Sequence, residues 1–99
     1  MMFYVKVHKV TGEVMLAGCD EEVLGKVFCE GDLEIKVNEG FYGGEIVDEN
    51  QLMKKVKDAT IVNFMGDRIV DLALEKGLVA KEGVRIIAGI KHAQIIAVD

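Results

Sequence analysis

The chain has 99 residues, of which 51% are hydrophobic and 29% are charged, and its formal net charge is −5. This composition excludes a disordered chain, and the length suits one globular domain spanning residues 1–99. The sequence contains no Ser, Pro or Trp. Every serine nucleophile is therefore excluded, and Thr11 and Thr60 are left as the hydroxyls of that kind.

The charge is unevenly distributed along the chain. Residues 1–53 hold 4 basic and 11 acidic side chains, a net charge of −7, whereas residues 54–99 hold 8 and 6, a net charge of +2. A partner with phosphate groups would therefore prefer the second half. The isoelectric point near 5.0 argues against strong non-specific binding to nucleic acid, and we expect no DNA partner.

The sequence predicts neither a membrane span nor an export signal. No window approaches the roughly 18 apolar residues that a membrane helix needs. The apolar run that begins at Met1 leads into an alternating pattern and lacks a basic leader. It therefore predicts a first strand and not a targeting segment, and we expect a cytoplasmic protein.

Cys19 and Cys29 do not have the spacing of a metal-ligand pair, so we expect neither a metal site nor a cofactor. In a reducing cytosol both would be free thiols, and two small buried side chains are the simplest interpretation. Asn and Gln total only five, which is typical of thermophiles. In such hosts an intrachain disulfide is the alternative.

The first part of the chain predicts a hairpin, a short helix and a third strand. Residues 3–7 alternate between apolar and polar and predict a half-buried strand, and residues 13–18 predict its partner across a glycine turn. Residues 20–28 begin with a favourable N-cap and place four apolar side chains on one face, which predicts a short helix. Residues 33–37 alternate again and predict a strand.

The middle of the chain predicts a loop, a helix and a buried strand. Residues 40–44 contain three glycines in five positions, which is typical of a loop. Asp48 and Gln51 have the spacing of a capping box, so we expect a helix to follow, with Leu52 beginning its apolar stripe. Residues 60–64 form a β-branched run and predict a buried strand.

The last third predicts a helix and a second hairpin. Gly66 opens the helix and Gly77 ends it. Residues 84–88 and 93–98 predict two strands separated by Gly89. The complete order is ββαβαβαββ, which predicts an α+β fold with a mixed sheet covered by helices.

The segment from Asn63 to Arg68 is the best local candidate for a ligand site. A strand is expected to end, a turn to follow at Gly66, and a helix to begin, so that unpaired backbone N–H groups meet at the positive end of a helix dipole. Arg68 could add a bidentate grip on a carboxylate or phosphate. In the competing interpretation, Asp67 caps the helix and Arg68 forms a surface ion pair.

Tyr42 stands beside Gly43 and Gly44 in the expected loop. An aromatic side chain on a mobile loop could offer a stacking platform for a base. The alternative is that the ring covers the core while the glycines only allow the turn.

His92 and Gln94 lie in the expected last hairpin. His92 could act as an acid or base near neutral pH, and Cys19 or Cys29 could approach it in three dimensions as a nucleophile. A hydrogen-bonded structural histidine at a turn is the alternative. His8 alternates outward on the first strand, and we expect it to face solvent.

Four segments of the chain carry a family resemblance. They are Cys19–Lys26, Phe41–Gly44, Asn63–Val70 and His92–Ile95. In this order they resemble an archaeal family catalogued as domain of unknown function 424, over nearly all of the chain. The resemblance implies a small archaeal cytosolic protein and no established activity, substrate or cofactor, so the motif residues are candidates for a shared site.

We expect at least three of Tyr42, Asn63, Arg68 and His92 to line one surface, with Arg68 supplying the positive charge. All four are expected at ends of elements or in glycine-bounded turns, and such turns often gather at one edge of a sheet. The competing interpretation is that each motif serves only its own turn. The candidate binding residues are Tyr42, Gly43, Gly44, Asn63, Gly66, Arg68, His92 and Gln94.

Three functions fit the sequence. The favoured one is a small non-enzymatic binding module for RNA or a ribonucleoprotein partner, which rests on the positive second half, the Arg68 junction and the Tyr42 loop. The alternatives are a small enzyme using Cys19 or His92 near Asn63 and Arg68, and a structural subunit of a homo-oligomer. No signature of a known RNA-binding module and no nucleophile–base pair of recognisable spacing decides between them.

Overall fold

The computed structural model describes residues 1–96. Its strands are β1 (Met2–Val10), β2 (Glu13–Asp20), β3 (Val27–Glu30), β4 (Leu33–Lys36), β5 (Glu45–Asp48), β6 (Ile61–Met65), β7 (Val84–Ile87) and β8 (Ile90–Ile96). Its helices are α1 (Glu39–Tyr42), α2 (Glu49–Asp58) and α3 (Asp67–Glu75), with the one-turn 3-10 helices η1 (Glu21–Val23) and η2 (Lys81–Gly83). No helix in this part of the chain is both long enough and apolar enough to cross a membrane.

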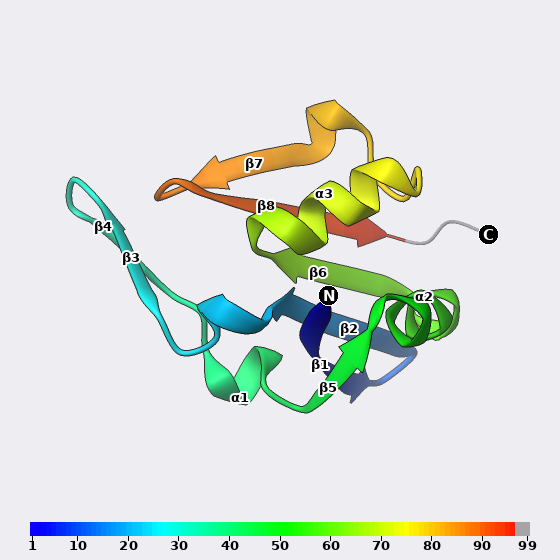
Figure 1. Ribbon diagram of the computed structural model, residues 1–99. Coiled ribbons are helices and arrows are strands. Elements are labelled where there is room, and N and C mark those ends of the chain that lie inside the picture. The colour runs from blue at the N-terminus through cyan, green and yellow to red at the C-terminus, as the bar shows by residue number, and fades with distance from the viewer. Residues whose placement is uncertain (97–99) are drawn as a thin grey trace.

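Six strands form one mixed sheet in the order β5-β1-β2-β6-β8-β7 (Figure 1). Neighbouring strands are antiparallel except for β2 and β6, which run parallel. The predicted hairpins β1–β2 and β7–β8 are both present, on either side of β6. The mixed sheet with its helices confirms the predicted α+β class.

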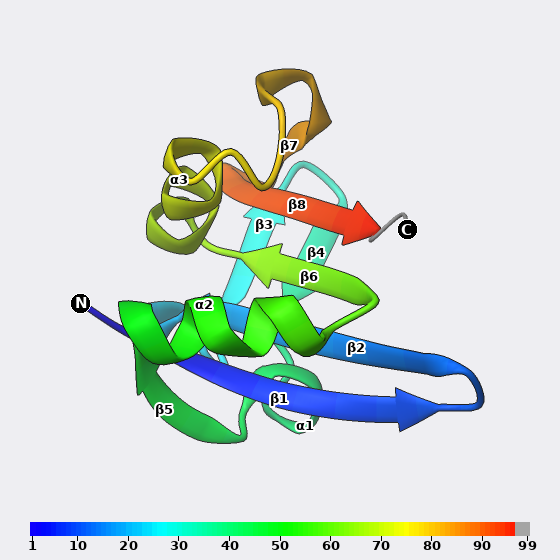
Figure 2. The same cartoon turned by 90° about the vertical axis from the view of Figure 1, so that its right-hand side faces the viewer.

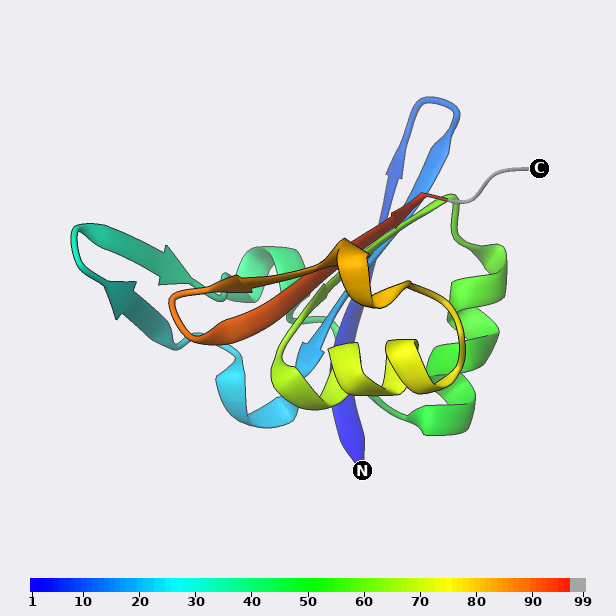
Figure 3. The same ribbon diagram turned by 90° about the horizontal axis from the view of Figure 1, so that it is seen from above.

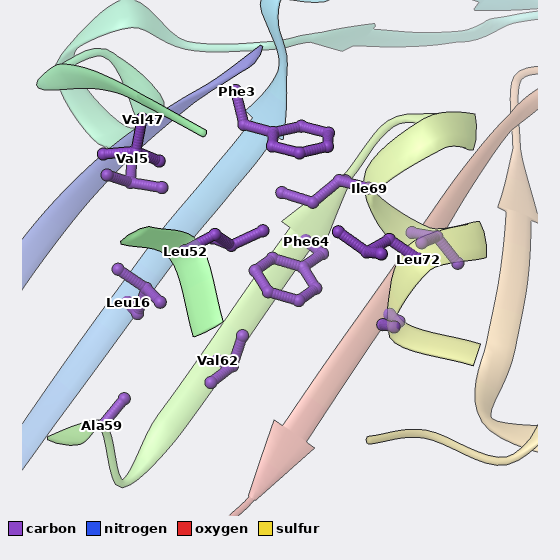
Figure 4. Packing of buried hydrophobic residues seen from close by; sticks show 13 residues of the cluster. Phe3, Val5, Leu16, Val47, Leu52, Ala59, Val62, Phe64, Ile69 and Leu72 are labelled. Carbon is purple, nitrogen blue, oxygen red and sulfur yellow. The ribbon is translucent and has the colours of Figure 1, made fainter. Parts of the chain in front are cut away.

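Helices α2 and α3 cover one face of the sheet, which we call the helical face (Figures 2 and 3). Strand alternation points the largest buried side chains toward these helices (Figure 4). This core includes Phe3, Val5, Leu16, Val47, Leu52, Val62, Phe64, Ile69 and Val70. Burial of each large apolar side chain contributes about 1.5–3 kcal/mol, so this core holds the sheet and both helices together.

The opposite face of the sheet, which we call the open face, is covered only in part. Here α1 and the separate two-stranded sheet β3–β4 pack over a second buried cluster. Its members are Ala17, Cys19, Val37, Tyr42, Met65 and Ile90. The β3–β4 hairpin extends away from the body of the protein (Figure 1). Toward β7, the open face carries the exposed side chains of Arg85 and Gln94.

The predicted capping box starts α2. The Asp48 side chain accepts a hydrogen bond from the backbone N–H of Gln51 at 2.8 Å, and the Gln51 side-chain oxygen accepts one from the Asp48 N–H at 2.9 Å. The two bonds satisfy backbone donors that a helix start leaves free. Leu52 follows and is fully buried, so local sequence and tertiary packing agree here.

The predicted helix over residues 20–28 is wrong. Only the single turn η1 forms, after which Gly25 adopts a φ of 79° and β3 begins. Phe28 lies opposite Ile35 in the β3–β4 hairpin, and both pack against the second buried cluster. The apolar spacing therefore serves tertiary contacts of a strand, which a helical period cannot distinguish in so short a segment.

The predicted loop over residues 40–44 is wrong in part. Asn38 accepts two backbone hydrogen bonds and caps α1, which ends at Tyr42. The strand β5 follows without having been predicted, and it pairs antiparallel with β1. A Cβ at Gly44 would collide with the backbone of Val5, so glycine is required where the chain enters this edge strand.

The last strand begins earlier than the predicted strand, which covered residues 93–98. It starts at Ile90, because Ala88 and Gly89 alone form the turn, with φ values of 52° and 80°. Two central residues with positive φ make a type I′ turn, whose twist matches that of the strands it joins. Residues 97 and 98 of the predicted strand lie outside the described residues.

Candidate functional site

The junction between β6 and α3 has its predicted position, but its anion site is filled from within the chain. Gly66 directly precedes α3. The carboxylate of Asp20, which is 2% exposed, accepts hydrogen bonds from the backbone N–H groups of Arg68 at 2.9 Å and Ile69 at 2.7 Å. Asp20 therefore caps α3. The prediction that Asp67 caps it is wrong, since that carboxylate accepts a backbone hydrogen bond from β8.

Arg68 is held in a surface ion pair. Its Nε donates to Glu22 Oε2 at 2.7 Å, and a second guanidinium nitrogen donates to the other carboxylate oxygen. This bonding lowers the pKa of Glu22 to about 2. The guanidinium carbon lies 5.5 Å from the centre of the Phe3 ring, in the core of the helical face. The surface-pair interpretation is confirmed, and the expectation that Arg68 supplies charge to a shared site is wrong.

Tyr42, Asn63 and His92 meet on the open face. The Tyr42 hydroxyl donates to Asn63 Oδ1 at 2.5 Å, and His92 Nε2 lies 3.2 Å from the same oxygen. The expectation that these residues lie in turns or at ends of elements is wrong for Asn63 and His92, which lie inside β6 and β8. Tyr42 is the last residue of α1. Three segments far apart in sequence thus build what we call the Tyr42–Asn63–His92 cluster.

The hydrogen bonds of this cluster fix the protonation of His92. A carboxamide oxygen only accepts hydrogen bonds, so Nε2 of His92 carries a proton. Burial, and to a lesser degree the Arg85 guanidinium, lowers the pKa of His92 below its ordinary value of 6.5, so the ring is neutral at pH 7. Its Nδ1 is then an acceptor, and it is buried with no hydrogen-bond partner among residues 1–96.

A cavity of about 280 Å³ opens beside His92 on the open face. Glu82 and Gly83 of η2, Arg85 of β7 and Gln94 of β8 complete its lining. Arg85 lies directly opposite His92 across the β7–β8 pair, which places a guanidinium beside the imidazole. The volume is near the lower end of the range for ligand pockets, so the cavity suits one small polar group.

Strand β1 anchors α1 to the open face. His8 stacks on Phe41 with ring centroids 4.9 Å apart, and its Nε2 lies 2.8 Å from the Phe41 carbonyl oxygen. Lys6 Nζ donates to a carbonyl oxygen of α1 at 2.9 Å. The prediction that His8 faces solvent is therefore wrong. Burial raises the pKa of Tyr42 to about 12, so the hydroxyl that α1 presents stays protonated.

The two cysteines are free, so the disulfide alternative is wrong. Cys19 is completely buried, and burial together with the adjacent Asp20 carboxylate raises the pKa of its thiol to about 12. A protonated, enclosed thiol is a poor nucleophile, so Cys19 does not pair with His92 as one. Cys29 is exposed on β3, and the prediction of two buried cysteines is correct for Cys19 only. Within residues 1–96, no group of three or more His, Cys, Asp or Glu side chains is placed to hold a metal ion.

Comparison with known proteins places this geometry in a family. Residues 8–98 match the family described as protein of unknown function, DUF424. The chain belongs to this family. Its fold is similar to the crystal structure of an uncharacterized conserved protein from the archaeon Methanopyrus kandleri, with a TM-score of 0.84, 22% sequence identity, and coverage of 100% of this chain and 96% of that chain. At this identity the likeness shows the fold alone. No curated protein matches the chain.

In this DUF424 chain, three of the four segments that carry the family resemblance meet at the Tyr42–Asn63–His92 cluster, and one of them also lines the cavity. Phe41–Gly44 supplies Tyr42 to the cluster, and His92–Ile95 supplies both His92 and Gln94. The segment that begins at Asn63 supplies the oxygen that joins them. Four of the eight candidate binding residues therefore lie together on the open face, and Arg68 lies apart from them.

The three candidate glycines lie at two places, since Gly43 and Gly44 follow α1 and Gly66 precedes α3. Gly66 has a φ of 128°, and a Cβ there would lie 2.5 Å from the carboxyl carbon of Asp20. A Cβ at Gly43 would lie 2.6 Å from the backbone oxygen of Glu39. Together with Gly44, these are positions of close backbone approach, and we assign them to packing and not to ligand contact.

The sequence reasoning missed Arg85 and Glu82. No local pattern marks either residue, because one stands in an apolar strand and the other in a polar turn. Hairpin register is the signal that could have found Arg85, since a two-residue turn at residues 88–89 places it opposite His92. The expected second strand began three residues too late and concealed this pairing.

Proposed function

We propose that this DUF424 protein is an RNA-binding module that holds unpaired nucleotides on the open face, at the cavity beside His92. The observation that carries the proposal is the convergence of imidazole, carboxamide and guanidinium groups on an uncovered stretch of the sheet. Arg85 and Gln94 are exposed there, and the Tyr42–Asn63–His92 cluster lies beside them.

The side-chain chemistry of the cavity suits the edges of unpaired bases. The carboxamide of Gln94 both donates and accepts hydrogen bonds, and a guanidinium binds a phosphate or a guanine edge through two donors. Proteins that recognise RNA sequence bind splayed single strands, in one common module on an open β-sheet surface. A cavity of about 280 Å³ suits one small polar group, such as the edge of an unpaired base or a single phosphate.

The charge of the protein determines the expected mode of binding. The net charge of −5 opposes a long polyanion, and Arg85 is the cation of the cavity lining, with Glu82 as a nearby carboxylate. For single strands, the slope of log affinity against log salt is about −0.7 per phosphate contact. We therefore expect a shallow slope of about −0.7 and not the steep slope of a basic protein.

Fluorescence anisotropy with a labelled, unstructured RNA oligonucleotide of randomised sequence tests the proposal. Arg85→Ala and Gln94→Ala should each weaken binding by about tenfold, because a lost bidentate contact costs about 1–3 kcal/mol. Arg68→Ala is the matched control. Its guanidinium is bound to Glu22 beside Phe3, so its removal should leave the RNA affinity unchanged.

Ligand controls separate this site from general electrostatic attraction. The same sequence as single-stranded DNA tests for 2′-hydroxyl contacts, and double-stranded RNA tests whether bases must be unpaired. Equal affinity for duplex and single strand contradicts the proposal, as does binding that depends on Arg68 and not on Arg85. Absence of RNA binding by the wild-type protein at low salt overturns it.

A further inference from the structure

Strand β7 is an edge of the six-stranded sheet, and one row of its backbone groups has no partner strand among residues 1–96. It pairs with β8 on one side, in the register that puts Ile87 opposite Ile90 across the two-residue turn. The pair that closes such a turn exchanges both backbone hydrogen bonds, and these groups alternate along a strand. The N–H and C=O groups of Ile86 and Val84 therefore point away from β8, toward a missing neighbour.

Strand β7 has two features that limit pairing at a sheet edge, since it is only four residues long and contains Arg85, but its other three side chains are apolar. The sequence of β7 is Val-Arg-Ile-Ile, with strong β propensity and no Pro. Ile86 is 70% exposed although it is one of the largest apolar side chains. The opposite edge differs, because β5 begins with Glu45 and ends with Asp48. Two β5 strands brought together would set carboxylates of the two copies close to one another.

We propose that β7 pairs antiparallel with β7 of a second copy of this chain, around a two-fold axis through Ile86. Such an axis keeps each face of the sheet continuous. Because side chains alternate between the two faces along a strand, two residues that lie opposite each other must both have even numbers or both have odd numbers. The outward backbone groups pair when Ile86 lies opposite Ile86 of the second copy. Arg85 then faces Ile87 of the second copy and not another arginine.

Other registers fit the side chains less well. A pairing centred on Arg85 would set two guanidinium groups directly opposite each other, and it would place Ile86 opposite the smaller Val84 of the second copy. A pairing centred on Val84 would set Ile86 against the carboxylate of Glu82 of the second copy. Only the register centred on Ile86 covers its exposed side chain with an equal apolar one.

The size of the interface sets the expected strength. Four residues a side bury less surface than a standard stable interface, so the dimer should be weak and dependent on protein concentration. Pairing would join the open faces of two copies into one surface, with the two cavities on either side of the axis and Arg85 of each copy near it. The inference rests on the sheet edge and does not depend on RNA binding.

Sedimentation velocity over a range of protein concentrations up to about 1 mM tests the pairing. The wild-type protein should shift from monomer toward dimer, and Ile86→Lys should remain a monomer with unchanged circular dichroism. Ile46→Lys is the matched control, because Ile46 is also an exposed isoleucine but lies on β5, and it should dimerise like the wild type. A wild-type protein that stays monomeric throughout would assign the edge to a different partner and overturn the proposal. Loss of the dimer in Ile46→Lys alone would overturn it as well.

Disulfide trapping tests the register itself. Paired residues that exchange both hydrogen bonds have Cα atoms about 5.5 Å apart, within the range of about 4.4–6.8 Å that a disulfide spans. Ile86→Cys in a Cys29→Ala background should therefore form a covalent dimer under mild oxidation. Val10→Cys in the same background is the control, as it is exposed at the far end of β1. Equal trapping of the two variants would reflect random collision and contradict the proposed register.

Discussion

His92 couples the binding of one proton to the stability of the fold. Burial lowers its pKa below 6.5 in the folded protein, and the unfolded chain restores the ordinary value. Between these two pKa values the unfolded state binds more protons, so the free energy of unfolding falls as the pH falls through this interval. The full contribution of neutral His92 is present above pH 6.5.

We therefore expect the wild-type protein to lose stability between pH 7 and pH 5, and His92→Gln to lose less over the same interval. Glutamine keeps a donor for Asn63 but has no proton to gain. Urea unfolding at pH 7 and pH 5 measures the free energy of unfolding of each protein. The difference between the two pH values is then compared, so that any loss of stability that His92→Gln causes equally at both pH values cancels. Equal pH dependence in the two proteins would exclude His92 as the responsible group.

Residue type alone identified the three members of the Tyr42–Asn63–His92 cluster, but it did not identify Arg85 as the charged residue beside them. Tyr42, Asn63 and His92 were marked by their hydrogen-bonding groups and by the segments in which they stand. Arg68 was chosen for its guanidinium, yet its partner Glu22 lies 46 residues away in sequence. Whether an arginine is free or paired depends on such distant contacts, so the sequence could not separate Arg68 from Arg85.

At the scale of elements, α3 depends on a cap that another strand supplies. Asp20 at the end of β2 accepts hydrogen bonds from the backbone N–H groups of Arg68 and Ile69 at the start of α3. These two donors are separated from Asp20 by 48 and 49 positions in the sequence. A hydrogen bond to a charged group contributes about 1.5–3 kcal/mol, and its loss leaves buried donors unsatisfied. We expect Asp20→Ala to lower the free energy of unfolding by about 3 kcal/mol or more. Asp20→Asn should cost less, because its amide oxygen still accepts.

Guanidinium chloride unfolding at pH 7 measures these losses. Glu22→Ala is the control, since it removes the exposed ion pair with Arg68, which should contribute about 0–1 kcal/mol. A loss in Asp20→Ala no larger than that in Glu22→Ala would contradict the capping role.

Elements with local signals were predicted correctly, and elements held by distant contacts were not. The capping box at Asp48 and the glycine before α3 act within one turn of helix, so the sequence contains the whole signal. The segment 20–28 was misassigned because its apolar residues face a cluster built by other strands. Strand β5 was missed because its four residues are stabilised by pairing with residues of β1 that lie 40 or more positions earlier.

The candidate site exists only at the scale of the whole molecule. The parallel pairing of β2 with β6 and the antiparallel pairing of β6 with β8 set Asn63 between the other strands. Helix α1 then crosses the open face and brings Tyr42 to it. A parallel pair requires a long connection, so no local pattern encodes this arrangement. The sequence indicated Tyr42, Asn63 and His92 as candidates, but the topology of the sheet determines that they contact one another.

At the scale of the whole molecule we also expect parts of unequal stability. The β3–β4 hairpin is a separate sheet, and most of its residues are exposed. Phe28 and Ile35 are the side chains that pack it against the second buried cluster. A two-stranded hairpin is only marginally stable in water. We therefore expect its amides to exchange with solvent through local opening, and the amides of β2 and β6 only through global unfolding.

Hydrogen exchange followed by NMR measures this difference, and two phenylalanine substitutions locate its cause. Phe28→Ala should accelerate exchange in the β3–β4 hairpin alone, because it removes the contact that holds the hairpin to the body. Phe64→Ala opens a cavity in the core of the helical face at a cost of about 3–5 kcal/mol, so exchange should accelerate in every strand that opens by global unfolding. If the hairpin amides exchange as slowly as those of β6 in the wild type, the hairpin belongs to the same cooperative unit as the six-stranded sheet.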